Sequence, residues 1–134
     1  MASGQANSVV VAPVPWFPSQ SPRFGDWAVN ARVAPRETRH DIEVLHPRYP
    51  VIPRTGMSLA PYLLYRAVLP MMHRLLTSGR RFAAIDAHYV YPDGVAAAML
   101  AERLRLPFVL TARGTDVNVL ACMPGPGRRI LWAA

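Results

Sequence analysis

Short apolar segments alternate with polar turns and longer amphipathic segments along this chain. The clearest series begins with an apolar strand at Phe82–Ile85, continues with an alanine-rich helix at Val95–Leu104 and ends with a strand at Pro107–Leu110. Elements in this order form a βαβ unit, whose two strands are almost always parallel with a right-handed crossover. The polar turns after the two strands are therefore predicted to lie at one edge of a sheet, where open α/β sheets bind ligands.

Two further strands are predicted nearer the N-terminus. The β-branched run Ser8–Ala12 indicates a buried strand, and the alternating segment Asp41–Leu45 indicates a strand near a sheet edge, because its acids have to face water. The proline-rich segments Pro13–Pro18 and His46–Pro50 are predicted to end these strands, since proline removes backbone donors. Between residues 19 and 39 little periodicity is present, and only one or two turns of helix are expected.

A long amphipathic helix is predicted from Ser58 to Thr77, with an apolar stripe of leucine, methionine and alanine. Ser58 is a suitable N-cap and Gly79 is placed to close the helix. Pro61 fits the first turn, whereas Pro70 is expected to kink the helix. The combined pattern predicts an α/β fold with a parallel sheet and flanking helices.

Composition and charge narrow the class of partner. All 15 basic residues are arginine, against 8 acids, and the net charge of +7 favours anionic partners. The arginines are scattered without interleaved aromatic residues, which disfavours nucleic acid. A single cysteine, Cys122, excludes an intramolecular disulfide and indicates a cytoplasmic setting. No segment has the pattern of a signal peptide or of a transmembrane helix.

Polar residues with possible chemical roles follow the four predicted strands. With a parallel sheet, one edge collects His46, Arg48, His88, Asp93, Arg113 and Asp116. Arg113 followed by Gly114 suits an anion, because guanidinium offers paired donors and glycine permits close backbone approach. His88 can donate or accept a hydrogen bond near neutral pH, or serve only a structural role. Asp93 is an N-cap candidate for the following helix.

Other interpretations stay open on the residues alone. Tyr89 and Tyr91 are interpreted as packing groups in preference to stacking platforms, and His73 as a surface residue of the long helix. The histidines lack the spacing of a metal site, so no metal is predicted. No phosphate loop, dinucleotide glycine motif or nucleophile elbow is present. The residues predict an anion-binding α/β crevice without naming a reaction.

Two segments resemble the amino-terminal half of family 4 glycosyltransferases. They are Asp86-Ala87-His88 with Tyr91-Pro92-Asp93-Gly94-Val95-Ala96-Ala97, and Pro107-Phe108-Val109-Leu110-Thr111-Ala112-Arg113-Gly114-Thr115-Asp116. Pro13–Pro18 and His46–Tyr49 occur in the expected order. The resemblance covers about residues 8–134 and implies a GT-B fold of two Rossmann-like domains. Residues 1–134 would be an incomplete amino-terminal, acceptor-side domain, with the carboxy-terminal donor domain absent.

The resemblance also implies a reaction and a set of site residues. Such enzymes transfer a sugar from a nucleotide diphosphate sugar to an acceptor with retention at the anomeric carbon, usually without a metal or further cofactor. His88 and Arg113 would be catalytic, with Arg113 standing where many members have a histidine. The implied substrate-binding residues are Pro15, Trp16, His46, Arg48, Asp93, Gly94, Gly114 and Asp116.

The implied partners are a nucleotide sugar and a saccharide or lipid-linked acceptor, in the cytoplasm or at the inner face of the membrane. The isolated chain is expected to be inactive. Two alternatives remain: a nucleotide-sugar epimerase of the same architecture, and a non-catalytic basic module that binds a membrane or a partner through the 58–76 helix and the arginines.

Overall fold

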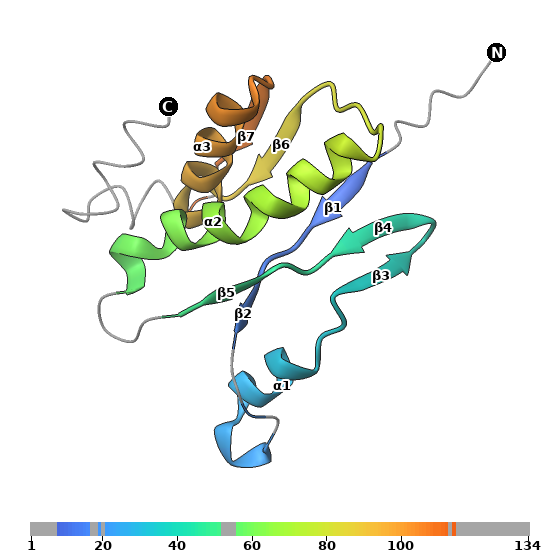
Figure 1. Ribbon diagram of the computed structural model, residues 1–134. Coiled ribbons are helices and arrows are strands. Elements are labelled where there is room, and N and C mark those ends of the chain that lie inside the picture. The colour runs from blue at the N-terminus through green and yellow to red at the C-terminus, as the bar shows by residue number, and fades with distance from the viewer. Residues whose placement is uncertain (1–7, 17–18, 20, 52–55, 113, 115–134) are drawn as a thin grey trace. The chain divides into compact units, whose positions relative to one another are not determined.

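The computed structural model describes residues 8–16, 19, 21–51, 56–112 and 114 (Figure 1). It is a mixed α/β structure that divides into two compact units, Met1–Pro50 and Val51–Ala134. The described strands form three small sheets, one of three strands and two of two strands. Three of the four described strand pairings are parallel, and one is antiparallel.

The first unit contains the elements β1 (Val9–Val11), β2 (Val14–Trp16), η1 (Pro22–Phe24), α1 (Asp26–Arg32), β3 (Arg36–Arg39), β4 (Ile42–Leu45) and β5 (Arg48–Pro50). Strand β1 pairs with β4, and β2 pairs with β5, both in parallel. Strand β3 pairs antiparallel with β4, so β4 lies in the middle of its sheet and the prediction of an edge strand was wrong. The short helix α1 packs against β2.

Strands β1 and β4 end at Val11 and Leu45, before the proline-rich segments, as predicted, but these segments also pair with each other as β2 and β5, which was not predicted. Backbone N–H groups of Ala12 and Val14 each donate to a carbonyl of the opposite strand at 2.9 Å. In a parallel ladder, alternate residues bond to a given neighbour. Pro13 and Pro15 occupy the intervening positions, where a missing N–H removes no bond to that neighbour.

The β3–β4 hairpin was also missed. Its turn residues, His40 and Asp41, have φ angles of 50° and 63°. Positive φ at both central residues is typical of the mirror-image turn that best matches the twist of two-residue hairpins. The pairing of Arg39 with Ile42 leaves these two residues as the loop. Asp41 therefore belongs to the turn and not to the strand.

The second unit contains α2 (Gly56–Thr77), β6 (Ile85–His88), η2 (Val90–Gly94), α3 (Val95–Leu104) and β7 (Phe108–Thr111). Strands β6 and β7 are parallel neighbours, which confirms the predicted βαβ order. Strand β6 starts three residues later than predicted, because its first ladder bond runs from the Ile85 N–H to the Pro107 carbonyl at 2.9 Å. Asp86 and His88 therefore lie within the strand and not in the turn after it.

Helix α2 packs against α3 and η2. It begins at Gly56, so Ser58 is not its N-cap, and it continues through Pro61 and Pro70. Pro61 is fully buried, and Leu64, on the same face, is buried too. No helix among the described residues has both the length and the apolar character needed to cross a membrane.

The first turns of helix α3 are mostly buried, whereas its C-terminal end carries the exposed residues Glu102 and Arg103. Its buried residues are Val95, Ala96, Ala97, Ala98, Leu100 and Ala101. Small side chains let a helix approach its neighbours closely on several sides, here α2, β6 and β7. Because η2 leads directly into α3, the N-cap position of α3 is Gly94, whose φ and ψ are helical. The prediction that Asp93 is the N-cap was therefore wrong.

Replacing Gly94 with alanine is expected to lower the free energy of unfolding by about 1–3 kcal/mol, the usual cost of overpacking. An added Cβ would lie 2.5 Å from Leu110 Cδ1 and 2.8 Å from the Tyr89 carbonyl oxygen. Urea unfolding followed by circular dichroism measures the change. In a Leu110→Ala background the cost of Gly94→Ala should shrink; an equal cost in both backgrounds would rule out the Leu110 contact as its source.

Candidate functional site

The predicted site residues fall in both units of the structure. Those in the first unit are Pro15, Trp16, His46 and Arg48, and those in the second are His88, Asp93, Gly94 and Gly114. Arg113 and Asp116 lie outside the described residues. The structure brings residues together within each group, and the two groups are considered in turn.

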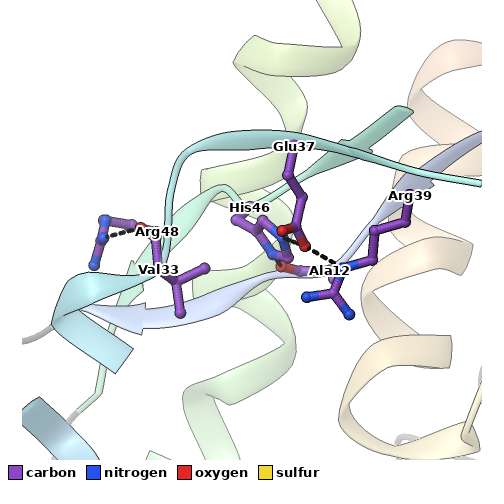
Figure 2. A network of polar contacts seen from close by, with 6 residues as sticks. All are labelled: Ala12, Val33, Glu37, Arg39, His46 and Arg48. Carbon is purple, nitrogen blue, oxygen red and sulfur yellow. Dashed lines mark hydrogen bonds and ion pairs between the residues drawn. The ribbon is translucent and has the colours of Figure 1, made fainter. Parts of the chain in front are cut away.

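In the first unit, His46 lies between β4 and β5 in the chain and contacts Ala12, which follows β1, and Glu37 of β3 (Figure 2). Its Nδ1 is 2.9 Å from the carbonyl oxygen of Ala12, and its Nε2 is 3.0 Å from Oε1 of Glu37. A carbonyl oxygen only accepts hydrogen bonds, so Nδ1 carries the hydrogen in this arrangement. The imidazole therefore connects the β1 side of the sheet to β3.

The contact to Ala12 replaces a missing backbone bond. The Ala12 N–H donates to the Leu45 carbonyl, and Val14 donates to the Pro47 carbonyl. By the alternation of a parallel ladder, the Ala12 carbonyl should accept from the N–H of residue 47. Residue 47 is proline and has no N–H. The ring of His46 supplies the donor that the backbone lacks.

Glu37 completes this polar cluster. Its Oε1 lies 2.8 Å from Nε of Arg39 and 3.0 Å from the His46 ring. The hydrogen bond from His46, assisted by the hydrogen bond and charge of Arg39, lowers the pKa of Glu37 from its ordinary value of 4.5, although burial acts in the opposite direction. A protonated His46 ring satisfies both of its contacts by donating from each nitrogen.

Arg48 binds the end of helix α1 (Figure 2). Its guanidinium donates to the carbonyls of Asn30, Ala31 and Val33 at 3.2, 3.1 and 2.7 Å. The last carbonyls of a helix have no partner within the helix and carry partial negative charge, so a cation there is stabilising. Arg48 thus has a structural role in attaching α1 to β5, and its role in substrate binding stays a prediction.

Pro15 and Trp16 lie in β2, opposite Tyr49 and Pro50 of β5. The Trp16 side chain is exposed at the end of that strand. An exposed indole beside proline offers an apolar surface with one polar N–H. Within this unit, the ladder thus places the predicted residues of β2 next to the strand that begins with Arg48.

In the second unit, His88 is the last residue of β6 and lies opposite Thr111, the last residue of β7. The side chains of His88 and Asp86 are 55% and 67% exposed, and His88 Nε2 is 3.6 Å from Oδ2 of Asp86. Together with Thr111 and Val109 these residues form the exposed face of the β6–β7 ladder. An imidazole, a carboxylate and a hydroxyl therefore share one accessible strand face.

The turn after His88 contains the most unusual backbone of this unit. Tyr89 has φ 71° and ψ 130°, a combination that residues with a side chain rarely adopt. Its N–H donates to the Thr111 carbonyl at 3.1 Å, and its carbonyl accepts from Gly94 at 3.0 Å. Such conformations cost about 1–3 kcal/mol and persist only where the surroundings enforce them, typically at functional sites. From the sequence, Tyr89 was interpreted as a packing residue.

Asp93 and Gly94 follow in η2, the irregular turn that leads into α3. Gly94 is buried, and its close contacts with Leu110 and with the Tyr89 carbonyl explain why a glycine stands there. Gly114 is exposed. The substrate contacts predicted for these three residues stay predictions.

The β6–β7 end has the groups needed to bind a polyhydroxylated ligand. The imidazole and the hydroxyl can each donate a hydrogen bond to a sugar hydroxyl or accept one from it, and the carboxylate can accept one. Within the described residues no three histidine, cysteine or acidic side chains are grouped so that they could hold a metal ion.

Comparison with known proteins gives one match. Over 35 residues the chain is 51% identical to "Putative teichuronic acid biosynthesis glycosyltransferase TuaC" of Bacillus subtilis (strain 168). This similarity supports a glycosyltransferase. The matched segment covers 26% of this chain and 9% of that protein, so only a small part of the relative's length is represented. No family model and no solved structure matches the chain.

Replacing His46 with leucine is expected to lower the free energy of unfolding by about 1–3 kcal/mol, because the Ala12 carbonyl loses its donor. Pro47→Ala restores a backbone N–H at the position that a regular ladder uses. His46→Leu should therefore cost less in the Pro47→Ala background, as measured by urea unfolding at pH 7. Equal costs in the two backgrounds would show that His46 does not substitute for the Pro47 donor.

The lowered pKa of Glu37 predicts that the folded chain loses stability in acid. Its pKa is lower in the folded chain than the ordinary 4.5. The stabilisation is therefore complete above that value and is lost as the pH falls below it, through the lower folded pKa. Thermal unfolding between pH 7 and pH 3 should show a shallower acid decline for Glu37→Gln than for the wild type. Glu102→Gln, at an exposed position of α3, is the control; the same effect from both variants would contradict this origin.

Proposed function

We propose that the chain forms the acceptor-side part of a retaining family 4 glycosyltransferase with a GT-B fold. The donor would be a nucleotide diphosphate sugar, and the acceptor a saccharide or a lipid-linked saccharide. A second, donor-binding domain outside residues 1–134 would hold the nucleotide. The isolated chain would then bind sugar without transferring it.

The observation that carries this proposal is the similarity to a glycosyltransferase, found in a chain whose predicted βαβ unit is present. Strands β6 and β7 run in parallel, and His88 ends β6 at the edge where α/β sheets bind ligands. The exposure of His88 and Asp86 makes both side chains accessible to a substrate.

The proposed roles follow from the chemistry of sugar transfer. Departure of a nucleoside diphosphate leaves negative charge on the phosphate oxygens, and positively charged donors that meet this charge in the transition state accelerate the reaction. Arg113, two residues after β7, would supply such donors. His88 would bind a hydroxyl of the transferred sugar or of the acceptor. The net charge of +7 supports an anionic donor and an acceptor at an anionic membrane surface.

Uridine diphosphate glucose (UDP-glucose) and methyl α-glucopyranoside are suitable first ligands for the 134-residue chain, with binding followed by saturation-transfer NMR. His88→Ala is expected to weaken binding by about tenfold, the effect of losing one or two hydrogen bonds. His73→Ala, which removes an exposed histidine from α2, is the matched control and should leave binding unchanged.

Absence of binding to both ligands, or equal effects of the two histidine variants, would contradict the proposed site. Product analysis after incubation with the nucleotide sugar distinguishes the reaction class. An epimerised sugar nucleotide formed without an acceptor would replace the transferase proposal with an epimerase. Turnover by the isolated chain with an acceptor would contradict the proposed need for a second domain.

A further inference from the structure

Tyr89 has a backbone conformation that the fold enforces and that its side chain disfavours. Its φ of 71° and ψ of 130° are fixed on one side by the bond to the Thr111 carbonyl and on the other by the bond from Gly94. Glycine adopts positive φ without the penalty that a Cβ brings. A bulky residue at such a position is a genuine outlier and calls for a physical reason.

Among the described residues of this unit, the other non-glycine residue with a positive φ has an ordinary explanation. Arg105 has φ 54° and ψ 44°, the left-handed conformation that commonly ends a helix, and it follows α3 directly. Tyr89 differs, since its ψ of 130° lies outside that region. Helix termination therefore does not account for the conformation of Tyr89.

Core packing does not account for Tyr89 either. Tyr91, two residues further along the same turn, is 2% exposed and belongs to the core, whereas Tyr89 is 46% exposed. The turn thus assigns one tyrosine to the interior and leaves the ring of the other accessible. Tyr89 directly follows His88, and its N–H binds the backbone of Thr111, so it lies at the polar end of the β6–β7 ladder.

We propose that Tyr89 is a sugar-binding residue whose ring stacks on the face of a pyranose held beside His88 and Thr111. An aromatic ring presents a negative face that attracts the weakly positive C–H groups of a sugar, while its apolar area is removed from water. The neighbouring polar side chains would bind the hydroxyls at the rim of the same sugar. This inference rests on the proposed function and adds to it the residue that recognises the sugar ring.

Three variants of Tyr89 separate stacking from structure. Tyr89→Phe keeps the ring, Tyr89→Ala removes the ring but keeps the Cβ, and Tyr89→Gly removes both. Relief of the positive φ should give Tyr89→Gly a Tm about 4 °C above that of Tyr89→Ala. Sugar affinity should be reduced by about tenfold in both of these variants and retained in Tyr89→Phe.

The ligands are UDP-glucose, methyl α-glucopyranoside and UDP, titrated by saturation-transfer NMR into the 134-residue chain. Loss of UDP-glucose binding alone assigns the ring to the donor sugar, and loss of methyl glucoside binding assigns it to a free saccharide. UDP lacks the transferred sugar and its nucleotide would be held by the second domain, so no Tyr89 variant should bind UDP differently from the wild type, and strong binding to the 134-residue chain is not expected. Arg105→Gly, which also relieves a positive φ, is the matched control and should leave all affinities unchanged.

The outcomes separate this inference from the proposed function. Sugar binding by the wild type that is unchanged in Tyr89→Ala and Tyr89→Gly would overturn the stacking role alone. Affinity that follows Tm across the three variants would assign Tyr89 a structural role and also overturn it. Absence of sugar binding by the wild type would overturn the proposed function together with this inference.

Discussion

Pairing of backbone groups in a chain with 14 prolines is the constraint on which the first unit depends. An unpaired buried carbonyl costs free energy comparable to a lost hydrogen bond, so each proline in a ladder needs either a harmless position or a substitute donor. Pro13 and Pro15 occupy harmless positions next to the residues that donate to the opposite strand. At Pro47 the position is not harmless, and His46 supplies the donor. The same histidine then binds Glu37, which connects the parallel pair to the antiparallel hairpin.

The parts of the fold that depend on local periodicity were predictable from the sequence. The alanine-rich segment predicted α3 with its observed bounds, β7 was predicted one residue early, and the start of α2 two residues late. Strand β6 was predicted in the right order along the chain but three residues early. Elements that depend on distant partners were not predictable. Strand β3 is polar on both faces and is stabilised by pairing with β4, including the ion pair of Arg36 with Glu43 at 2.9 Å. The expected cap at Asp93 failed because an irregular turn precedes α3.

In the candidate site too, features that depend on the local sequence were predictable and those that depend on distant partners were not. His88 was predicted in the turn after a strand, whereas it is the last residue of β6. Its position near a strand end is a local signal, because polar residues there follow an apolar run. The role of His46 could not be predicted, because it depends on the carbonyl of Ala12, 34 positions before His46, facing Pro47, which has no N–H. The conformation of Tyr89 depends on backbone hydrogen bonds to Gly94 and Thr111. The residues next to Tyr89 in the sequence do not indicate these bonds.

Both parallel pairs of the first unit share one register, with Val11 opposite Leu45 and Val14 opposite Arg48, the same spacing that joins Ala12 to His46. The register of these strands is thus fixed by contacts both before and after residues 12–13, which separate β1 from β2. It does not depend on the length of the chain that connects β2 to β3. That connection includes α1, which packs against β2 and is held to β5 by Arg48, so only the parts of it outside α1 can change in length while these contacts stay in place. The exposed turn between α1 and β3, at Ala34, is therefore a favourable point for inserting a reporter peptide without disturbing the sheet.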